Sequence, residues 1–227
     1  MANENILSGG IVPPAVALTN AEMASFNEGF NAVTALYDEY GPDSLSYILR
    51  SEKPTYVLGA EYAKAAFGQN FGGIVGSSGI NMQLIRSATV LSQGSSTPVY
   101  TWSKNITTTG WGSLFGSKTT QFTLKNSQGG NTVVNTYKNV MFVATHIIDS
   151  VKPLYDEIQI GANSTDYPIY PVTTQKIGGR YVIKLPMPLV ILNDTQFYVM
   201  ANYQRLGTAS PQLLGFQYAL HTYATLQ

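Results

Sequence analysis

The most regular pattern of hydrophobic and polar positions lies between Gly179 and Tyr203. Every odd position from Tyr181 to Ile191 is apolar, and after a short turn the same parity resumes at Phe197. Successive side chains of a strand point to opposite faces, so this period of two predicts two strands with one buried face each. Pro186 and Pro188 have no backbone N–H to donate, which places the middle of the first strand at a sheet edge or a bulge.

Short runs of β-branched and aromatic residues continue from residue 80 onward. Gly, Asn, Ser and Pro separate the runs, and no helical stretch interrupts them, which argues against a parallel sheet. The predicted strands are 82–91, 98–107, 119–125, 132–137, 140–148, 155–161, 167–172, 181–192, 196–203 and 213–224, with 127–131 as a hairpin tip. The pattern predicts a mainly β protein built as an antiparallel two-sheet sandwich, either a jelly roll or an immunoglobulin-like fold.

The clearest helix signals begin at Thr19. This residue is a good N-cap, and Glu22, three positions later, completes a capping box. Apolar residues then recur at spacings of three and four from Met23 to Tyr40, before Gly41-Pro42 ends the pattern. Shorter helices are predicted within 43–53 and 55–67. Three helices in about fifty residues bury too little surface to fold alone, so we expect them to pack on the β domain or on a neighbouring subunit.

The predicted elements divide the chain into four segments. They are an extended N-terminal arm (1–18), a helical segment (19–67), a Gly-rich linker (68–79) and a jelly-roll β-sandwich (80–227). The glycine density of the linker is typical of a flexible connector. It contains no G-x-x-x-x-G-K-[ST] motif, and no G-x-G-x-x-G opens a helix, so a phosphate-binding loop is not predicted.

Charge is scarce and unevenly distributed. Charged residues form only 11% of the chain, against about 25% in a typical soluble domain. Uncharged polar surfaces of this kind suit packing against other subunits, although an ordinary extracellular β domain would have a similar composition. Residues 1–61 carry a net charge of −6, and residues 62–148 contain six bases and no acid. The N-terminal part is therefore expected to dock on its own or a neighbour's β domain, while the bases are too sparse for nucleic-acid binding.

No catalytic or metal-binding residues occur at a diagnostic spacing. The chain has no cysteine, and His146 and His221 stand in neither an H-x-H nor an H-E-x-x-H arrangement. They could bind a metal ion only if the fold brought Asp149 or Asp156 to them. A G-x-S-x-G elbow is missing, and Asp156 and Glu157 are neighbours that would point to opposite faces of a strand. The sequence therefore predicts no enzyme, no cofactor and no metal ion.

Trp102 and Trp111 flank a Thr/Asn-rich segment that is predicted to form a hairpin. Paired tryptophans can form a stacking platform for sugars, and this would make the protein a carbohydrate-binding or adhesin-type module. Alternatively, the two rings anchor loops against the sheet or a partner. The first ten residues lack the basic region and apolar core of a secretion signal, which counts against a secreted adhesin.

The strands V-M-F-V-A-T-H-I-I-D (140–149) and F-Y-V-M-A-N-Y-Q (197–204) are embedded in a strand-dense, charge-poor chain without cysteine. In these features, residues 80–227 resemble the single jelly-roll coat proteins of icosahedral viruses, especially internal-membrane viruses of archaea and thermophilic bacteria. The resemblance implies self-assembly into capsomers, strands standing upright on a membrane or genome, and no enzymatic activity. It further implies location in the virion, with copies of the chain and other capsid or membrane proteins as partners. The helices at 19–67 lie outside the minimal family pattern.

Under this interpretation the functional residues lie at subunit contacts. The arm, with Pro13 and Pro14, would reach a neighbouring subunit, and the prolines at 186 and 188 would protect a strand edge from uncontrolled pairing. Tyr155, Tyr167 and Tyr170 would supply rigid interface anchors, because tyrosine offers a large contact area with few torsions to freeze.

Overall fold

The computed structural model describes residues 14–38, 45–91, 101–116, 122–125, 131–134, 140–162, 165–193, 195 and 197–220. The helices are α1 (Asn20–Asp38), α2 (Leu45–Ser51), α3 (Lys53–Phe67) and α4 (Ser87–Leu91). The strands are β1 (Phe71–Ile74), β2 (Ile80–Leu84), β3 (Lys104–Ile106), β4 (Gly110–Gly116), β5 (Phe122–Lys125), β6 (Asn131–Val134), β7 (Val140–Asp149), β8 (Tyr155–Ala162), β9 (Thr165–Pro171), β10 (Thr174–Ile177), β11 (Arg180–Ile191), β12 (Phe197–Tyr203), β13 (Gly207–Ala209) and β14 (Gln212–Leu220). The prediction of a mainly β, antiparallel protein with an N-terminal helical segment is confirmed.

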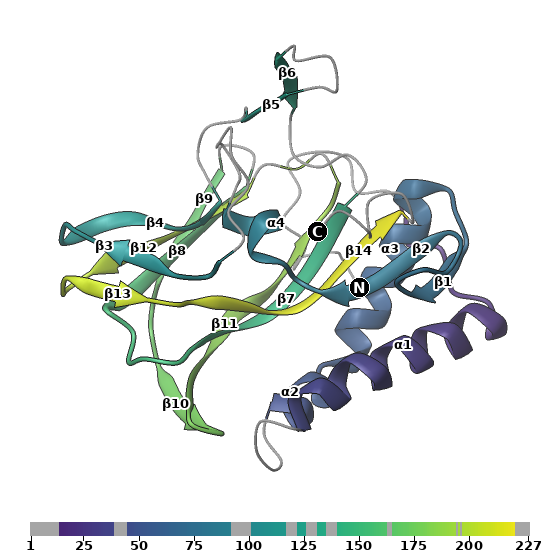
Figure 1. Cartoon of the computed structure of the whole chain (residues 1–227), viewed down its shortest axis with the longest axis horizontal. Coiled ribbons are helices and arrows are strands. Elements are labelled where there is room, and N and C mark those ends of the chain that lie inside the picture. Colours follow the sequence, from purple (N-terminus) through teal and green to yellow (C-terminus); the bar gives the residue numbers. More distant parts are fainter. Residues whose placement is uncertain are drawn as a thin grey trace.

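Most strands belong to one of two sheets (Figure 1). A six-stranded sheet has the order β1-β2-β14-β7-β11-β10, and a four-stranded sheet has the order β4-β12-β8-β9. Two small pairs, β3–β13 and β5–β6, lie outside these sheets. The pair β1–β2 is parallel, and the other strand pairs of the described residues are antiparallel.

Eight of the strands pair in a nested order. β2 pairs with β14, β4 with β12, β7 with β11 and β8 with β9. Successive pairs alternate between the six-stranded and the four-stranded sheet. These eight strands therefore form one antiparallel ribbon, which turns back on itself from β8 to β9 and winds across both sheets.

The main hydrophobic core lies between the two sheets. Phe142 of β7 meets Phe197 of β12 across this space in an edge-to-face contact, with ring centroids 4.9 Å apart. The parity predicted for β11 and β12 is confirmed, because Ile183, Leu185, Leu189, Ile191, Phe197, Val199, Ala201 and Tyr203 all belong to this core. The alternation of the sequence thus identifies the inner face of both sheets.

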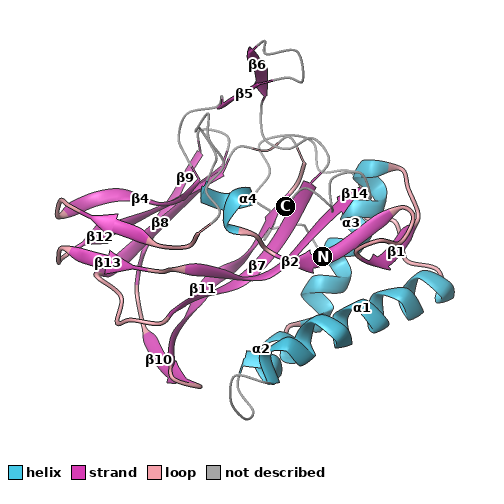
Figure 2. Ribbon diagram, in the orientation of Figure 1, coloured by secondary structure: helices cyan, strands magenta, loops and turns pink. Residues whose placement is uncertain are grey.

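Helices α1, α2 and α3 cover the other face of the six-stranded sheet (Figure 2). Val182 and Val190 of β11 are buried on that face, in the same cluster as Phe26 and Phe30 of α1. The expectation of one buried face is therefore wrong for β11, which is covered on both sides. The cause is the helical layer, which packs on its own β domain, one of the two alternatives expected from the sequence.

The capping box at the start of α1 is confirmed and extended. The Thr19 N–H donates to Glu22 Oε2 at 2.8 Å, and the Glu22 N–H donates to Thr19 Oγ1 at 3.3 Å. Lys64 of α3 and the N–H of Phe71 in β1 also donate to the Glu22 carboxylate, at 2.6 and 3.0 Å. One side chain therefore joins α1, α3 and β1. Pro54, expected to separate two helices, lies in the first turn of α3, where a missing N–H costs little.

Residues 68–79, predicted to be a flexible linker, contain β1 and extend the six-stranded sheet. The glycines serve close packing here. Gly73 has a φ of 95°, and a Cβ at this position would lie 2.8 Å from the carbonyl oxygen of Ser25 in α1. Glycine therefore lets the helix approach the strand backbone, which composition alone cannot distinguish from flexibility.

Three further expectations concern individual elements. The predicted strand 82–91 ends at Leu84, and its last five residues form α4. β3 pairs with β13 rather than with β4, so the segment between Trp102 and Trp111 is not a hairpin. The antiparallel pairing of β5 with β6 is confirmed, Asn131 of the predicted tip begins β6, and residues 126–130 lie outside the described residues. None of the helices that the structure describes is long and apolar enough to cross a bilayer.

Candidate functional site

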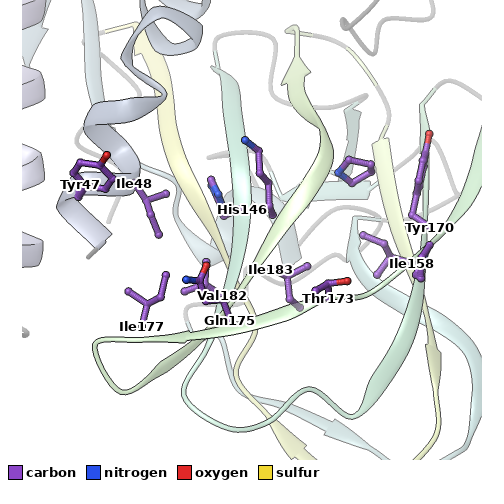
Figure 3. Close-up of a pocket in the computed structure, with 13 residues that line it drawn as sticks. Tyr47, Ile48, His146, Ile158, Tyr170, Thr173, Gln175, Ile177, Val182 and Ile183 are labelled. Atoms are coloured by element: carbon purple, nitrogen blue, oxygen red, sulfur yellow. The ribbon is translucent and has the colours of Figure 1, made fainter. Parts of the chain in front are cut away.

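A groove of about 640 Å³ opens where α2 approaches β9, β10 and β11 (Figure 3). Its walls are mainly apolar, with Ile48 from α2, Ile177 from β10, and Val182 and Ile183 from β11. This volume falls within the range of about 300–1,000 Å³ that is typical of small-molecule sites. The polar side chains at the groove include His146, Gln175 and Lys184.

A bulge in β11 shapes one wall of the groove. Between Lys184 and Leu189 the strand advances five residues, while its partner β7 advances only two, from His146 to Ala144. Pro186 lies in this irregular segment and lines the groove. The prediction that the prolines mark an edge or a bulge is therefore confirmed as a bulge, because a residue without an N–H cannot continue the ladder.

His146 stands on β7 beside a second bulge. It pairs with Leu214 of β14, whereas Ala144 pairs with Gly215, so Thr145 is an extra residue on β7. Gly215 permits this geometry, because a Cβ there would lie 2.0 Å from the carbonyl oxygen of Val143. The two consecutive polar side chains at this bulge are buried in the apolar middle of the strand.

A chain of hydrogen bonds holds His146 in place. Its Nδ1 lies 2.8 Å from Thr145 Oγ1, which in turn lies 2.7 Å from the Tyr56 hydroxyl of α3. The Tyr218 hydroxyl of β14 donates to the Tyr56 carbonyl at 2.5 Å. Because His146 is only 6% exposed, burial lowers its pKa to about 4; Lys184 lowers the pKa further and Glu52 opposes this. The imidazole is therefore neutral at pH 7.

Lys184 forms the charged rim of the groove. Its Nζ lies 3.1 Å from Glu52 Oε1, and 72% of the lysine side chain is exposed. The pair joins β11 to the residue preceding α3. Exposed ion pairs contribute only about 0–1 kcal/mol, so this contact positions the lysine more than it stabilises the fold.

The structure brings two of the predicted interface residues together. Tyr170 and Pro186 both line the groove. Tyr167 is half-buried against the core between the sheets, and Pro188 is half-buried in β11. The sequence did not connect these positions, because the β9–β10 segment returns to β11 only through the fold of both sheets.

The prediction that Tyr155 is an interface anchor on the surface is wrong. Its side chain is 4% exposed and packs edge-to-face on Tyr203, with ring centroids 5.9 Å apart, inside the core between the sheets. It is therefore no surface anchor in this chain, because β8 turns this position inward. At the arm, Pro14 is exposed, and Pro13 lies outside the described residues.

The two tryptophans differ in environment. Trp102 packs edge-to-face on Phe115 of β4, with ring centroids 6.3 Å apart, and contacts the core. Trp111 is 44% exposed and pairs with Asn202 of β12. Trp102 therefore fits the role of a loop anchor, and Trp111 offers the more exposed ring.

The remaining polar candidates do not gather around a metal ion. Among the described residues there is no group of three or more His, Cys, Asp or Glu that could hold one; His221 lies outside them. Asp149 is buried and accepts hydrogen bonds from the N–H groups of Val151 and Ser210. Burial raises the pKa of its carboxyl, and these hydrogen bonds oppose the rise.

The sequence considers His146 only as a conditional metal ligand, and it does not predict a neutral histidine at an apolar groove. The available signal was Thr145-His146, the polar pair within V-M-F-V-A-T-H-I-I-D. Two consecutive polar residues in a strand buried on both faces require partners, and this marks them as candidates.

Comparisons with known proteins give no relative from which a role could be transferred. No protein-family model matches the chain, and no match was found among curated proteins or solved structures.

Proposed function

We propose that this chain is a jelly-roll coat protein that assembles with copies of itself into a viral capsid shell. The observation that carries the proposal is the nested pairing of eight strands, β2 with β14, β4 with β12, β7 with β11 and β8 with β9. A jelly roll consists of eight strands in two sheets and two Greek keys, and it is a common fold of viral capsid proteins. An antiparallel ribbon wound across two sheets supports this fold.

The surface supports a role in assembly. Only 11% of the residues are charged, and the exposed large apolar side chains include Leu36 (52%), Tyr47 (69%), Ile169 (51%) and Leu206 (60%). Apolar and uncharged polar side chains are cheaper to bury at a contact between subunits than charges. Lectin domains also use the jelly roll, so the fold alone does not distinguish a coat protein from a carbohydrate-binding protein. The experiments below distinguish the two.

Electron microscopy and sedimentation of the purified full chain test the proposal. We expect closed shells or regular lattices above a threshold concentration. Removal of residues 1–13 should raise that threshold at least tenfold if the arm contacts a neighbour. This truncation retains Val16 and Ala17, which contact α3 through the Val16 N–H to Glu61 O (3.3 Å) and the Ala17 carbonyl to Lys64 Nζ (3.2 Å).

A Trp111→Ala variant provides the comparison. Under the coat-protein proposal, the variant assembles as the unmodified chain does, because assembly does not depend on glycan binding. If the full chain and the truncated chain both stay monomeric at high concentration, the coat-protein proposal is wrong. Binding to a glycan array that disappears in the Trp111→Ala variant would then establish the alternative.

A further inference from the structure

The groove between α2 and β9–β11 combines apolar walls with one buried polar group. Figure 3 shows His146 between Ile48 of α2 and Ile183 of β11, with the groove extending toward Tyr170. The Nδ1 of this histidine is engaged by Thr145. Within the part of the chain that the structure describes, Nε2 has no hydrogen-bond partner. A residue that is only 6% exposed therefore presents an unused polar edge to the groove.

The hydrogen bonds from Tyr56 through Thr145 to His146 determine which ring nitrogen of His146, Nδ1 or Nε2, carries the proton. If Tyr56 donates to Thr145, and Thr145 donates to Nδ1, both hydroxyl protons and the Nδ1 lone pair are satisfied. In the reverse direction the Tyr56 proton would be buried without an acceptor, which costs about 1–3 kcal/mol. The first arrangement leaves the proton of the neutral ring on Nε2. His146 thus offers an N–H donor to the groove.

The charges around the groove define the second requirement. Among the described residues that line the groove, Lys184 is the one charged side chain, and no acid lines it. Glu52 approaches from the helical layer, and its carboxylate is bound to Lys184. A ligand with an anionic oxygen at one end could therefore accept from Nε2 and approach the Lys184 ammonium, while its apolar part covers the isoleucine and valine side chains.

We propose that this groove binds an aliphatic carboxylate, with the carboxylate at His146 and Lys184 and the hydrocarbon chain along the apolar walls. In this proposal the imidazole ring binds the carboxylate in its neutral form, through the Nε2 N–H. An N–H donor in an apolar wall orients an oxygen acceptor, and the wall contacts provide the affinity. The site belongs to a single copy of the chain, so it does not depend on the coat-protein proposal.

Calorimetric titration of the full chain with decanoate tests the site. We expect saturable binding with one site per chain. His146→Phe keeps an aromatic ring at this position and removes the donor, and it should weaken decanoate binding at least tenfold. Decyltrimethylammonium has the same chain but no acceptor and the opposite charge, and it should bind at least tenfold more weakly than decanoate to the unmodified protein.

A second variant keeps the test decisive if His146→Phe does not fold. Lys184→Gln changes an exposed side chain and should weaken decanoate binding severalfold while leaving binding of decanol unchanged. Lys152→Gln is the matched control, because Lys152 is exposed and does not line the groove. In nitrogen-detected spectra, decanoate should shift the Nε2 signal of His146 in the unmodified chain. No saturable binding, or equal affinity in the folded His146→Phe variant, would overturn the proposal.

Discussion

At the scale of single residues, Glu22 joins three elements that are distant in the sequence. Burial alone would raise the pKa of its carboxyl, but hydrogen bonds from Lys64, Thr19 and the Phe71 N–H together lower it to about 2. An unfolded glutamate titrates near 4.5. Because the folded pKa is the lower one, the carboxylate stabilises the protein above about pH 4.5, and this contribution is lost as the pH falls toward 2.

Substitution of Glu22 by Gln should therefore lower the free energy of unfolding at pH 7 by about 2 kcal/mol, the range of hydrogen bonds to charged groups. Urea denaturation measures the effect. The difference between variant and parent should shrink as the pH falls from 4.5 toward 2. Glu28→Gln changes an exposed glutamate on the same helix and serves as the control. A difference that stays constant over this pH range would show that Glu22 acts through shape and not charge.

His146 gives a second pH dependence in a different range. Its pKa falls from 6.5 in the unfolded chain to about 4 in the folded protein, first because of burial. The unfolded state thus binds the proton more readily between these values, so stability is greatest above pH 6.5 and declines as the pH falls to 4. The His146→Phe variant should show a flatter decline in this range. Parallel stability curves for variant and parent would contradict this assignment.

At the scale of secondary-structure elements, the contact between α3 and the sheet depends on Gly59. A Cβ there would lie 2.5 Å from Val143 Cγ2 and 2.9 Å from the Tyr218 ring. Alanine is about 1 kcal/mol better than glycine within a helix. The overpacking should nevertheless dominate, so we expect Gly59→Ala to destabilise the protein by about 1–3 kcal/mol.

Thermal or urea denaturation measures this effect, with Gly29→Ala on α1 as the matched variant. A Cβ at Gly29 would have its nearest contacts at 3.3 Å, to the Cγ2 methyl of Ile74 and to Cε, the flexible end of Met82. These contacts need a shift of only a few tenths of an ångström, and the helix propensity of alanine offsets it, so Gly29→Ala should be close to neutral. If Gly59→Ala were as stable as Gly29→Ala, α3 would not be held against the sheet as closely as its contacts indicate.

The elements that the sequence predicts well are those specified by local patterns. The alternation in β11 and β12 identified the inner face, and Thr19 with Glu22 located the start of α1. The elements that it predicts poorly depend on distant partners. β1 becomes a strand because β2 and α1 border it, and the residues of α4 form a helix despite an apparent strand pattern.

The same division applies to the groove. The prolines of β11 predicted a bulge, and a bulge is present, but its role as a wall depends on α2 and on the segment joining β9 to β10. The donor role of His146 depends on Tyr56, which is 90 positions away. No local sequence pattern predicts this hydrogen-bond connection between Tyr56 and His146.

At the scale of the whole molecule, some acidic side chains of the helical layer are paired with basic side chains of the same chain. Glu22 pairs with Lys64 inside the helical layer, and Glu52 pairs with Lys184 of β11, so among the described residues the second ion pair ties the acidic helical layer to its own sheet. The surface that remains is poor in charge and contains exposed apolar side chains such as Tyr47. Contacts between copies are therefore expected to depend mainly on burial of uncharged surface.

This expectation distinguishes two modes of assembly. Salt screens charges over about 10 Å at 0.1 M and about 3 Å at 1 M, whereas excluded salts such as sulfate strengthen burial of apolar surface. If copies assemble through uncharged surface, the threshold concentration should change less than about threefold between 0.1 and 1 M sodium chloride. Ammonium sulfate should lower it, and cooling should raise it, because hydrophobic association weakens at low temperature. Light scattering against protein concentration measures all three effects. A steep rise of the threshold with sodium chloride would instead mean that the acidic helices of one copy dock on the basic residues of another.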